Sequence, residues 1–182
     1  MHNSQTWGCK ARVALTAGLA MLVASCGEPG AVYQRPPAEI RDLLRTVKVP
    51  LYMFGSSAET EAIVDGTNPN AIAWKIVADN SPLMTFTAKI TPEGDTGTRV
   101  TVDIQGARAG KFGDVQARME KAKEIRALYL VSMTEAVDST LNGRAFDITR
   151  TYPALIAAGT ANARIFAPPS KESSPSTSSN RR

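Results

Sequence analysis

Three neighbouring segments in the middle of the chain alternate apolar and polar residues with a period of two. They are residues 72–77, 83–91 and 98–105. This alternation is typical of half-buried β-strands that keep one polar face. Residues 79–82 and 92–97, which connect the segments, are rich in turn formers, so the pattern predicts an antiparallel meander. A sheet with one apolar face needs other elements to cover that face.

Helical periodicity flanks this meander on both sides. Apolar residues at i, i+3, i+4 and i+7 predict a short helix over 38–48. Residues 49–54 follow as an apolar strand or extended segment, and a weaker pattern over 59–65 adds a further strand. The predicted fold class is therefore α+β: an antiparallel β-meander of about three to five strands packed against a long helix and shorter helices.

The long helix is predicted over residues 114–142. Asp114 is a suitable N-cap, and Asn142 followed by Gly143 forms a C-terminal stop. A straight helix of this length would be about 43 Å long, so the prediction includes a bend or a break as an alternative. A last helix is expected over 153–164, with Leu155, Ile156 and Ile165 packing it against the rest.

The N-terminal segment combines a positive start with a short apolar stretch that ends in a cysteine. Lys10 and Arg12 precede apolar residues 13–24, and the stretch closes with Val-Ala-Ser-Cys at 23–26. About a dozen apolar residues are too few to cross roughly 30 Å of hydrocarbon, so the segment is typical of a secretory signal peptide. Its end resembles the lipobox of bacterial lipoproteins, and an ordinary signal peptide is the alternative. The resemblance implies cleavage before Cys26 and a diacylglyceryl group on its thiol.

The domain organisation follows from this processing. We expect a lipoprotein signal peptide over 1–25, a lipidated Gly/Pro-rich tether over 26–37, one α+β domain over 38–166 and a disordered Ser/Pro-rich tail over 167–182. Gly27 follows the cysteine where an aspartate would favour the inner membrane. The resemblance therefore implies an outer-membrane location facing the periplasm.

Processing also removes most reactive side chains. His2 and Cys9 lie within 1–25, so the mature chain has no histidine and Cys26 as its one cysteine. A Ser-His-Asp triad, a Cys-His pair, a His/Cys zinc site and an intrachain disulfide are thereby excluded. Losing Lys10 and Arg12 from 21 basic residues, against 17 acidic ones, leaves a net charge of about +2. With no basic cluster interleaved with aromatics, we expect no nucleic-acid partner, and no cofactor or metal.

Carboxylates are the remaining candidates for acid/base chemistry. Glu120 and Glu124 lie among Lys and Arg, as on an ordinary charged helix face. Glu135 and Asp138 flank a run more polar than a buried helix stripe needs, so they form a candidate site. Asp103 is expected to make exposed cross-strand pairs with Lys75, Lys89 or Arg99.

Three further features can each be interpreted as structural or as functional. The glycine-rich residues 106–112 fail as a phosphate-binding loop, because Phe112 replaces the magnesium-binding Ser or Thr. Arg144, Phe146 and Asp147 follow the helix stop and are expected to fix the turn into the next segment, with a partner surface as the alternative. Trp74 lies on the same face of its predicted strand as Ile72 and Ile76 and is expected in the core, with ligand stacking as the alternative.

Together these features predict a membrane-anchored envelope lipoprotein with a non-enzymatic interaction or structural role. It is held at the membrane by Cys26, with an envelope protein or polymer as partner. The alternative is a binding module for an apolar small molecule or lipid, since the order helix, meander, long helix resembles helix-grip, polyketide-cyclase-like folds. That alternative needs a void beside the sheet face of Trp74, Met84, Phe86, Val100 and Val102. A third alternative, an enzyme, needs Glu135 or Asp138 in a pocket with a shifted pKa.

Overall fold

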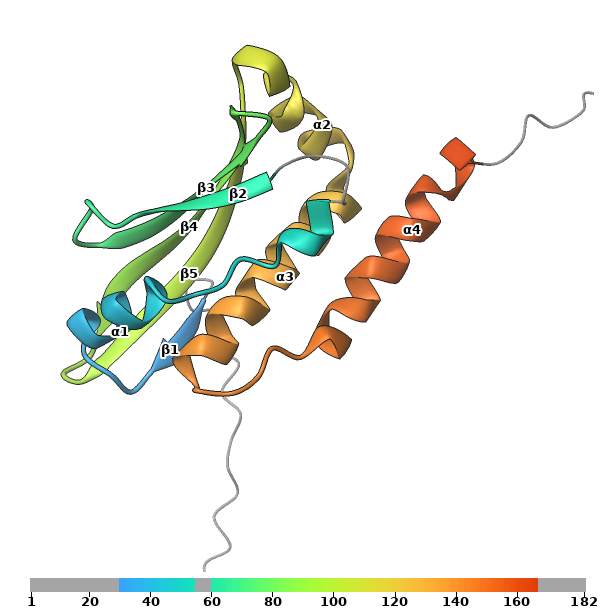
Figure 1. The fold of residues 1–182 in the computed structure, drawn as a ribbon. Helices are drawn as coiled ribbons and strands as arrows, with labels where there is room; N and C mark the ends of the chain where they lie inside the picture. The colour runs from blue at the N-terminus through green and yellow to red at the C-terminus, as the bar shows by residue number, and fades with distance from the viewer. Residues whose placement is uncertain (1–29, 55–59, 167–182) are drawn as a thin grey trace, which may run out of the picture.

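The computed structural model describes residues 30–54 and 60–166, with backbone alone for 162–166. A five-stranded antiparallel sheet forms one layer, in the order β1-β5-β4-β3-β2 (Figure 1). Helices cover one of its faces, so the α+β fold class is confirmed. The strands are β1 Ala31–Tyr33, β2 Thr60–Asp65, β3 Ala71–Ala78, β4 Ser81–Glu93 and β5 Gly97–Gly106.

The predicted meander is β3, β4 and β5, and β2 continues it at the edge. All four pair antiparallel in sequence order. The turn between β3 and β4 places Asp79 and Asn80 at φ 47° and 57°. This is the conformation that tight hairpin turns need and that Asp and Asn tolerate better than other side chains. The weaker strand pattern over 59–65 is thus confirmed as β2.

Four α-helices and three 3-10 turns make up the rest of the described chain. Helices α1 and α3 pack on the sheet, and α4 lies on α3, farther from the sheet (Figure 1). The α-helices are α1 Pro37–Leu44, α2 Val115–Lys121, α3 Lys123–Leu141 and α4 Tyr152–Phe166. The 3-10 turns are η1 Leu51–Phe54, η2 Gly110–Phe112 and η3 Ile148–Thr151.

The core lies between the sheet and the first helical layer. Trp74 and Phe86 face each other across β3 and β4, and both are fully buried. From the helices, Ile40, Met133 and Leu141 close over them with at most 1 % exposure. Apolar positions at alternate residues of the strands therefore meet the apolar stripes of α1 and α3, as the periodicity predicts.

Helix α3 is buried on two sides, which explains why residues 134–140 contain more polar side chains than one apolar stripe allows. One side packs on the sheet through Met133, Ala136 and Val137. The other side lies toward α4 and η3, where Glu135 is buried as well. The residues that exceed the needs of a single apolar stripe therefore belong to a second, polar contact.

The predicted helix over 114–142 is divided into two, which confirms the alternative of a break, because Ala122 leaves the helical region at φ −101° and ψ 72°. Two other details of these segments are wrong. Asp114 stands at the N-cap position of α2, but its carboxylate accepts a hydrogen bond from Arg118 instead of capping the backbone. Residues 51–54, expected as an extended segment, form the 3-10 turn η1.

The folded domain also begins earlier than expected. Residues 31–33, assigned to the tether, form β1 and pair with β5, so the predicted tether over 26–37 and the boundary at Ala38 are wrong at this point. Gly30 lies so close to β5 that a Cβ there would be 2.5 Å from Oγ1 of Thr101. The predicted signal peptide 1–25, Cys26 and the tail 167–182 lie outside the described residues.

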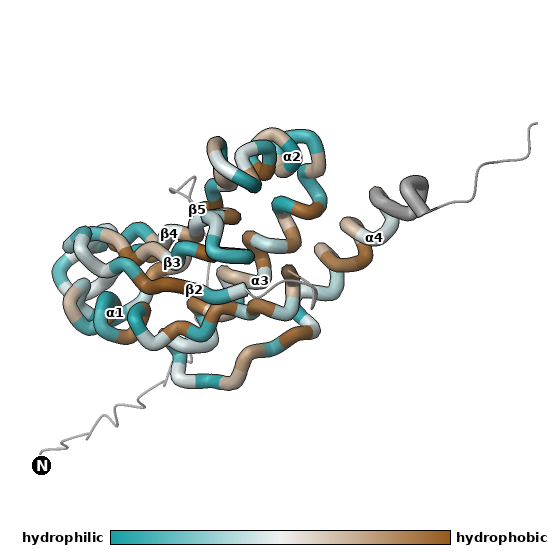
Figure 2. The backbone as a smooth tube through the Cα atoms, turned by 45° about the horizontal axis from the view of Figure 1, so that its top comes forward, coloured by the Kyte–Doolittle hydropathy of each residue, from teal (hydrophilic) through white to brown (hydrophobic). Residues whose placement is uncertain are grey.

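The last helix is confirmed as α4, but its predicted packing is wrong. Leu155 and Ile156 are 50 % and 68 % exposed, whereas the small Ala158 is buried. Helix α4 is therefore held on α3 by small residues, and its large apolar side chains point outward. Apolar segments continue along α4 at the outside of the molecule (Figure 2). The side chain of Ile165 lies outside the described residues.

Candidate functional site

The candidate pair Glu135 and Asp138 lies in the last two turns of α3. The Glu135 side chain is 4 % exposed and that of Asp138 is 26 % exposed. The spacing of three residues puts both carboxylates on one face of the helix, where η3 and α4 pack. Burying two carboxylates so close together requires positive partners.

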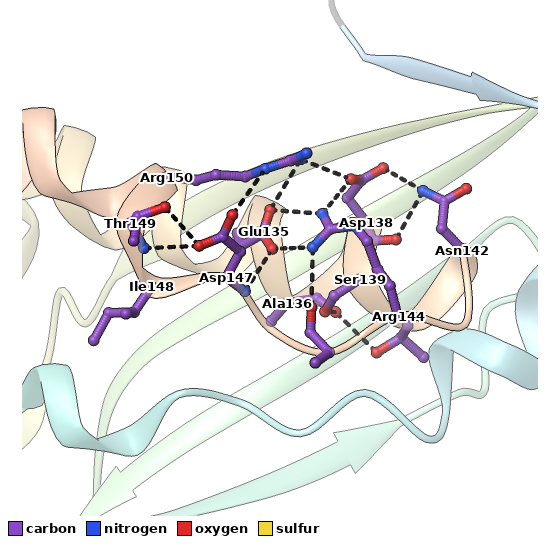
Figure 3. Close-up of polar contacts among 12 residues, drawn as sticks. Glu135, Ala136, Asp138, Ser139, Asn142, Arg144, Asp147, Ile148, Thr149 and Arg150 are labelled. Atoms are coloured by element: carbon purple, nitrogen blue, oxygen red, sulfur yellow. Dashed lines mark hydrogen bonds and ion pairs between the residues drawn. The ribbon is translucent and has the colours of Figure 1, made fainter.

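Arg144 is the first such partner, and the end of α3 aims it at the acids. The helix ends in a Schellman motif: the N–H groups of Gly143 and Arg144 donate to the carbonyls of Thr140 and Ser139, at 3.2 and 2.9 Å. Gly143 has φ 62°, a left-handed conformation that favours glycine. The chain therefore reverses there, and the Arg144 guanidinium donates to both oxygens of Glu135 and, at 2.6 Å, to Oδ2 of Asp138 (Figure 3).

The segment after Arg144 adds a backbone donor and a second guanidinium. The N–H of Asp147 donates to Oε1 of Glu135 at 2.9 Å. Arg150, from η3, lies 3.4 Å from Glu135 and 3.3 Å from Asp138 (Figure 3). Asp147 also accepts from the N–H of Thr149 at 3.0 Å, which caps η3.

The strand β1 reaches the same carboxylates. Tyr33 donates its hydroxyl hydrogen to Oδ1 of Asp138 at 2.9 Å, and Asn142 donates to the same oxygen at 2.8 Å. We call the set of Tyr33, Glu135, Asp138, Arg144, Asp147 and Arg150 the α3 ion cluster. It joins β1 to the end of α3 and to η3, which lie more than 100 residues later in the sequence.

The charges within the α3 ion cluster stabilise one another. The hydrogen bonds from Arg144 lower the pKa of Glu135 despite its burial. Burial alone would raise the pKa of Asp138, but the bonds from Arg144 and Tyr33 outweigh it and lower the pKa. Burial, together with the nearby carboxylate of Asp138, raises the pKa of Tyr33. At neutral pH both acids are thus ionised and Tyr33 is protonated.

This electrostatic arrangement suits a clamp better than a proton-transfer site. A general base works best with a pKa near the working pH. The guanidinium groups lower the pKa of both carboxylates, which takes these pKa values farther from neutral pH. Arg144 and Asp147, expected to fix the turn after α3, make contacts that fit this role. Phe146 adds an edge-to-face contact with Tyr52, with ring centroids 6.4 Å apart.

The second candidate region is an apolar cavity at the end of the sheet where α2 meets α3. It is a partly open pocket of about 320 Å³. Rings of Phe54 and Tyr129 lie against each other in its wall, with centroids 5.3 Å apart, and burial raises the pKa of Tyr129. The lining residues are Phe54, Leu83, Met84, Val115, Arg118, Met119, Ala122, Ile125 and Tyr129.

The centre of the sheet face is filled, in contrast. Phe86 and Trp74 are fully buried and Val100 is 3 % exposed, so helix side chains occupy the place where a helix-grip fold would need its void. Of the five sheet residues on which the binding-module alternative depended, Met84 lines the cavity at the end of the sheet. Trp74 is in the core, as its parity predicts.

The remaining candidates are dispersed over the surface. Glu120 accepts a hydrogen bond from Gln116 at 2.7 Å, and Glu124 is exposed at the start of α3. Asp103 forms an ion pair with Arg126 of α3 at 3.2 Å, not with the expected cross-strand cations, because Lys75 is paired with Asp65 and Arg99 with Glu93. Residues 106–112 form a loop and η2, where Lys111 pairs with Asp79 at 2.8 Å.

Within the described ranges, no group of three or more His, Cys, Asp or Glu side chains is arranged to hold a metal ion. Among the helices in these same ranges, none is both long and apolar enough to cross a membrane. Comparison with protein-family models, with curated proteins and with solved structures gives no match for this chain.

The sequence indicates most members of the α3 ion cluster but not that they meet. It predicts Glu135 and Asp138 as one site and Arg144 with Asp147 as another, places Tyr33 in the tether and gives no signal for Arg150. The signal that could join them is Gly143 after the helix, because a glycine that reverses the chain there returns the following residues toward the last turns of α3.

Proposed function

We propose that the protein is an envelope lipoprotein whose α+β domain has a non-enzymatic structural or interaction role at the membrane. The observation that carries this proposal is the apolar stretch that closes on Cys26 after a positive start. The first described strand, β1, begins at Ala31, five residues after the proposed lipid anchor, so the anchor would hold this strand close to the membrane. Gly27 favours the outer membrane, with the domain facing the periplasm.

The α3 ion cluster supports a structural role for the most prominent group of charged side chains. Glu135 and Asp138 each contact both arginines, and together they fasten η3 and α4 to the body of the domain. A domain built this way offers surfaces for contact with an envelope protein or polymer. Such a partner would meet the polar face of the sheet.

Membrane fractionation of a Cys26→Ser variant tests the proposal. We expect wild-type protein in the membrane fraction and the variant in the soluble periplasmic fraction or retained as unprocessed precursor. Cys9→Ser is the matched control, because Cys9 lies in the predicted signal peptide and its loss leaves the anchor intact. Equal membrane retention of wild type and Cys26→Ser as processed chains of the same acylated mass would contradict the proposal, since a retained precursor is recognised by its uncleaved signal peptide.

The cavity between α2 and α3 favours a second candidate function, the binding of an apolar small molecule. Its volume of about 320 Å³ lies at the lower end of the range of small-molecule sites. Native mass spectrometry of protein released in mild detergent tests this. A non-covalent mass that disappears in Ala122→Leu, which fills the cavity, and remains in the control Ala127→Leu, at an exposed position of α3, supports binding. Absence of any such mass from wild type speaks against it.

A further inference from the structure

The outer face of α4 is apolar, and its large side chains are exposed. Tyr152, Leu155 and Ile156 stand at i, i+3 and i+4, so they lie on one side of the helix. Their exposed fractions are 46, 50 and 68 %, and Ile148 of η3 adds another at 45 %. Between residues 152 and 161 the sequence contains no charged residue. A helix face in contact with water normally carries polar and charged side chains, so this surface is suited to an apolar environment.

The α3 ion cluster places this face close to the N-terminal end of the described domain. Tyr33 of β1 and Arg150, two residues before α4, both contact Asp138. A groove of about 340 Å³ runs between β1 and α3 and is lined by Ala31, Val131 and Arg150 among others. The first strand and the start of α4 thus flank the same side of α3.

The length of chain before β1 limits how far this side can lie from the proposed anchor. Gly30 is four residues after Cys26. Four fully extended residues span at most about 14 Å. A lipid on Cys26 therefore keeps the β1 edge within that distance of the bilayer surface, and with it the side of α3 that β1 and the start of α4 flank.

We propose that the outer face of α4 docks on the lipid bilayer in which Cys26 is anchored. This inference rests on the proposed lipidation of Cys26. Leu155 and Ile156 would enter the boundary between headgroups and acyl chains, and Tyr152 has the apolar ring and polar tip that suit this boundary. A single weak contact is sufficient, because the tether holds the helix at a high effective concentration near the lipid.

The far edge of the sheet provides a matched control. Strand β2 also exposes apolar side chains, with Ile63 at 49 % and Val64 at 44 %. In the order β1-β5-β4-β3-β2 it is the strand farthest from β1. If apolar exposure alone drove association with lipid, both β2 and α4 would insert into the bilayer. If the position of the anchor decides, α4 inserts and β2 does not.

Quenching by brominated lipid measures which side chains reach the bilayer. The acylated protein is reconstituted in phosphatidylethanolamine/phosphatidylglycerol vesicles as Ile156→Trp, Ile63→Trp or wild type. Wild type gives the background fluorescence of Trp74, a core residue that is fully buried. We expect bromination of the acyl chains to reduce the emission of Ile156→Trp and to leave the other two unchanged.

Flotation of the same vesicles tests the lipid anchor on Cys26 separately from the docking of α4. Protein that floats with the vesicles but shows equal quenching for Ile156→Trp and Ile63→Trp overturns docking and leaves the anchor in place. Protein that does not float overturns the anchor and, with it, the docking that depends on it. Burial of Ile156→Trp in detergent without lipid, together with a dimeric mass, overturns bilayer docking in favour of a second copy.

Discussion

Glu135→Gln should destabilise the domain far more than the same change at an exposed position of the same helix. The substitution keeps the shape of the side chain and removes its charge. Glu135 is 4 % exposed and accepts hydrogen bonds from Arg144, Arg150 and the N–H of Asp147. Without the carboxylate, Arg144 keeps its ion pair with Asp138, and Arg150 keeps Asp138 and the more distant Asp147.

The expected magnitude follows from burial and from the remaining partners. Removing one member of a fully buried ion pair costs about 3–5 kcal/mol. The side chains of Arg144 and Arg150 are 27 % and 55 % exposed and keep their contacts with Asp138, so solvent screens part of the loss. We expect the free energy of unfolding to fall by about 2–3 kcal/mol, which lowers Tm by roughly 4–12 °C in a domain of this size.

Thermal unfolding followed by circular dichroism measures this effect. The control is Glu124→Gln, an exposed acid at the start of α3, for which we expect a change within about 0.5 kcal/mol. Equal Tm values for Glu135→Gln and Glu124→Gln would refute the reasoning, because they would show that the α3 ion cluster does not hold η3 and α4 in place.

Three further predictions concern the same part of the molecule. The pKa values of Glu135 and Asp138 are lowered in the folded state, so their stabilisation is complete above the unfolded values near pH 4 and is lost as pH falls through the folded ones. Tm measured from about pH 5 to pH 3 should therefore fall in wild type, and less steeply in Glu135→Gln; parallel curves would contradict this. Gly143→Ala should lower the free energy of unfolding by about 1 kcal/mol in urea titrations, because Gly143 has φ 62° and an added Cβ meets no atom within 4 Å, which leaves backbone strain as the cost. An unchanged urea midpoint would show that the reversal after α3 tolerates a side chain. Tyr33→Phe should cost about 1–2 kcal/mol, since it removes a hydrogen bond to the charged Asp138, and should raise the pKa of that carboxyl, measured by NMR titration; an unmoved Asp138 pKa would mean that Tyr33 makes no such bond in solution.

The sheet was largely predictable because its signal is local. Alternation in β3, β4 and β5 reports directly which side chains face the core, and the Asp79-Asn80 turn fixes the hairpin between the first two. β1 carries no such signal, because so short a strand, three of the five residues between Gly30 and Pro36, forms only when the edge of β5 is available to pair with it.

The helices show the same division between local and tertiary causes. The ends of α3 and α4 follow from glycine and proline, but the break at Ala122 has neither residue nearby and depends on how α2 and α3 pack on the sheet. The apolar side chains of Leu155 and Ile156 predict burial of the wrong face of α4, because large apolar residues usually form the core. In the structure, Ala158 allows the close approach to α3 and the large side chains face outward.

The candidate site was predictable in its parts and not in its assembly. Glu135 and Asp138 stand out by their polarity within a buried helix, and Arg144 by its place after the stop. The hydrogen bond from Tyr33 to Asp138 joins residues that are 105 positions apart in the sequence. No spacing rule brings together groups so far apart, so the α3 ion cluster could be found only in the folded chain.

An intact-mass spectrum of the protein extracted from membranes tests the lipid anchor most directly. The account predicts a mass equal to residues 26–182 plus acyl chains on Cys26. A chain that still begins at Met1, or a processed chain that carries no lipid, would contradict it.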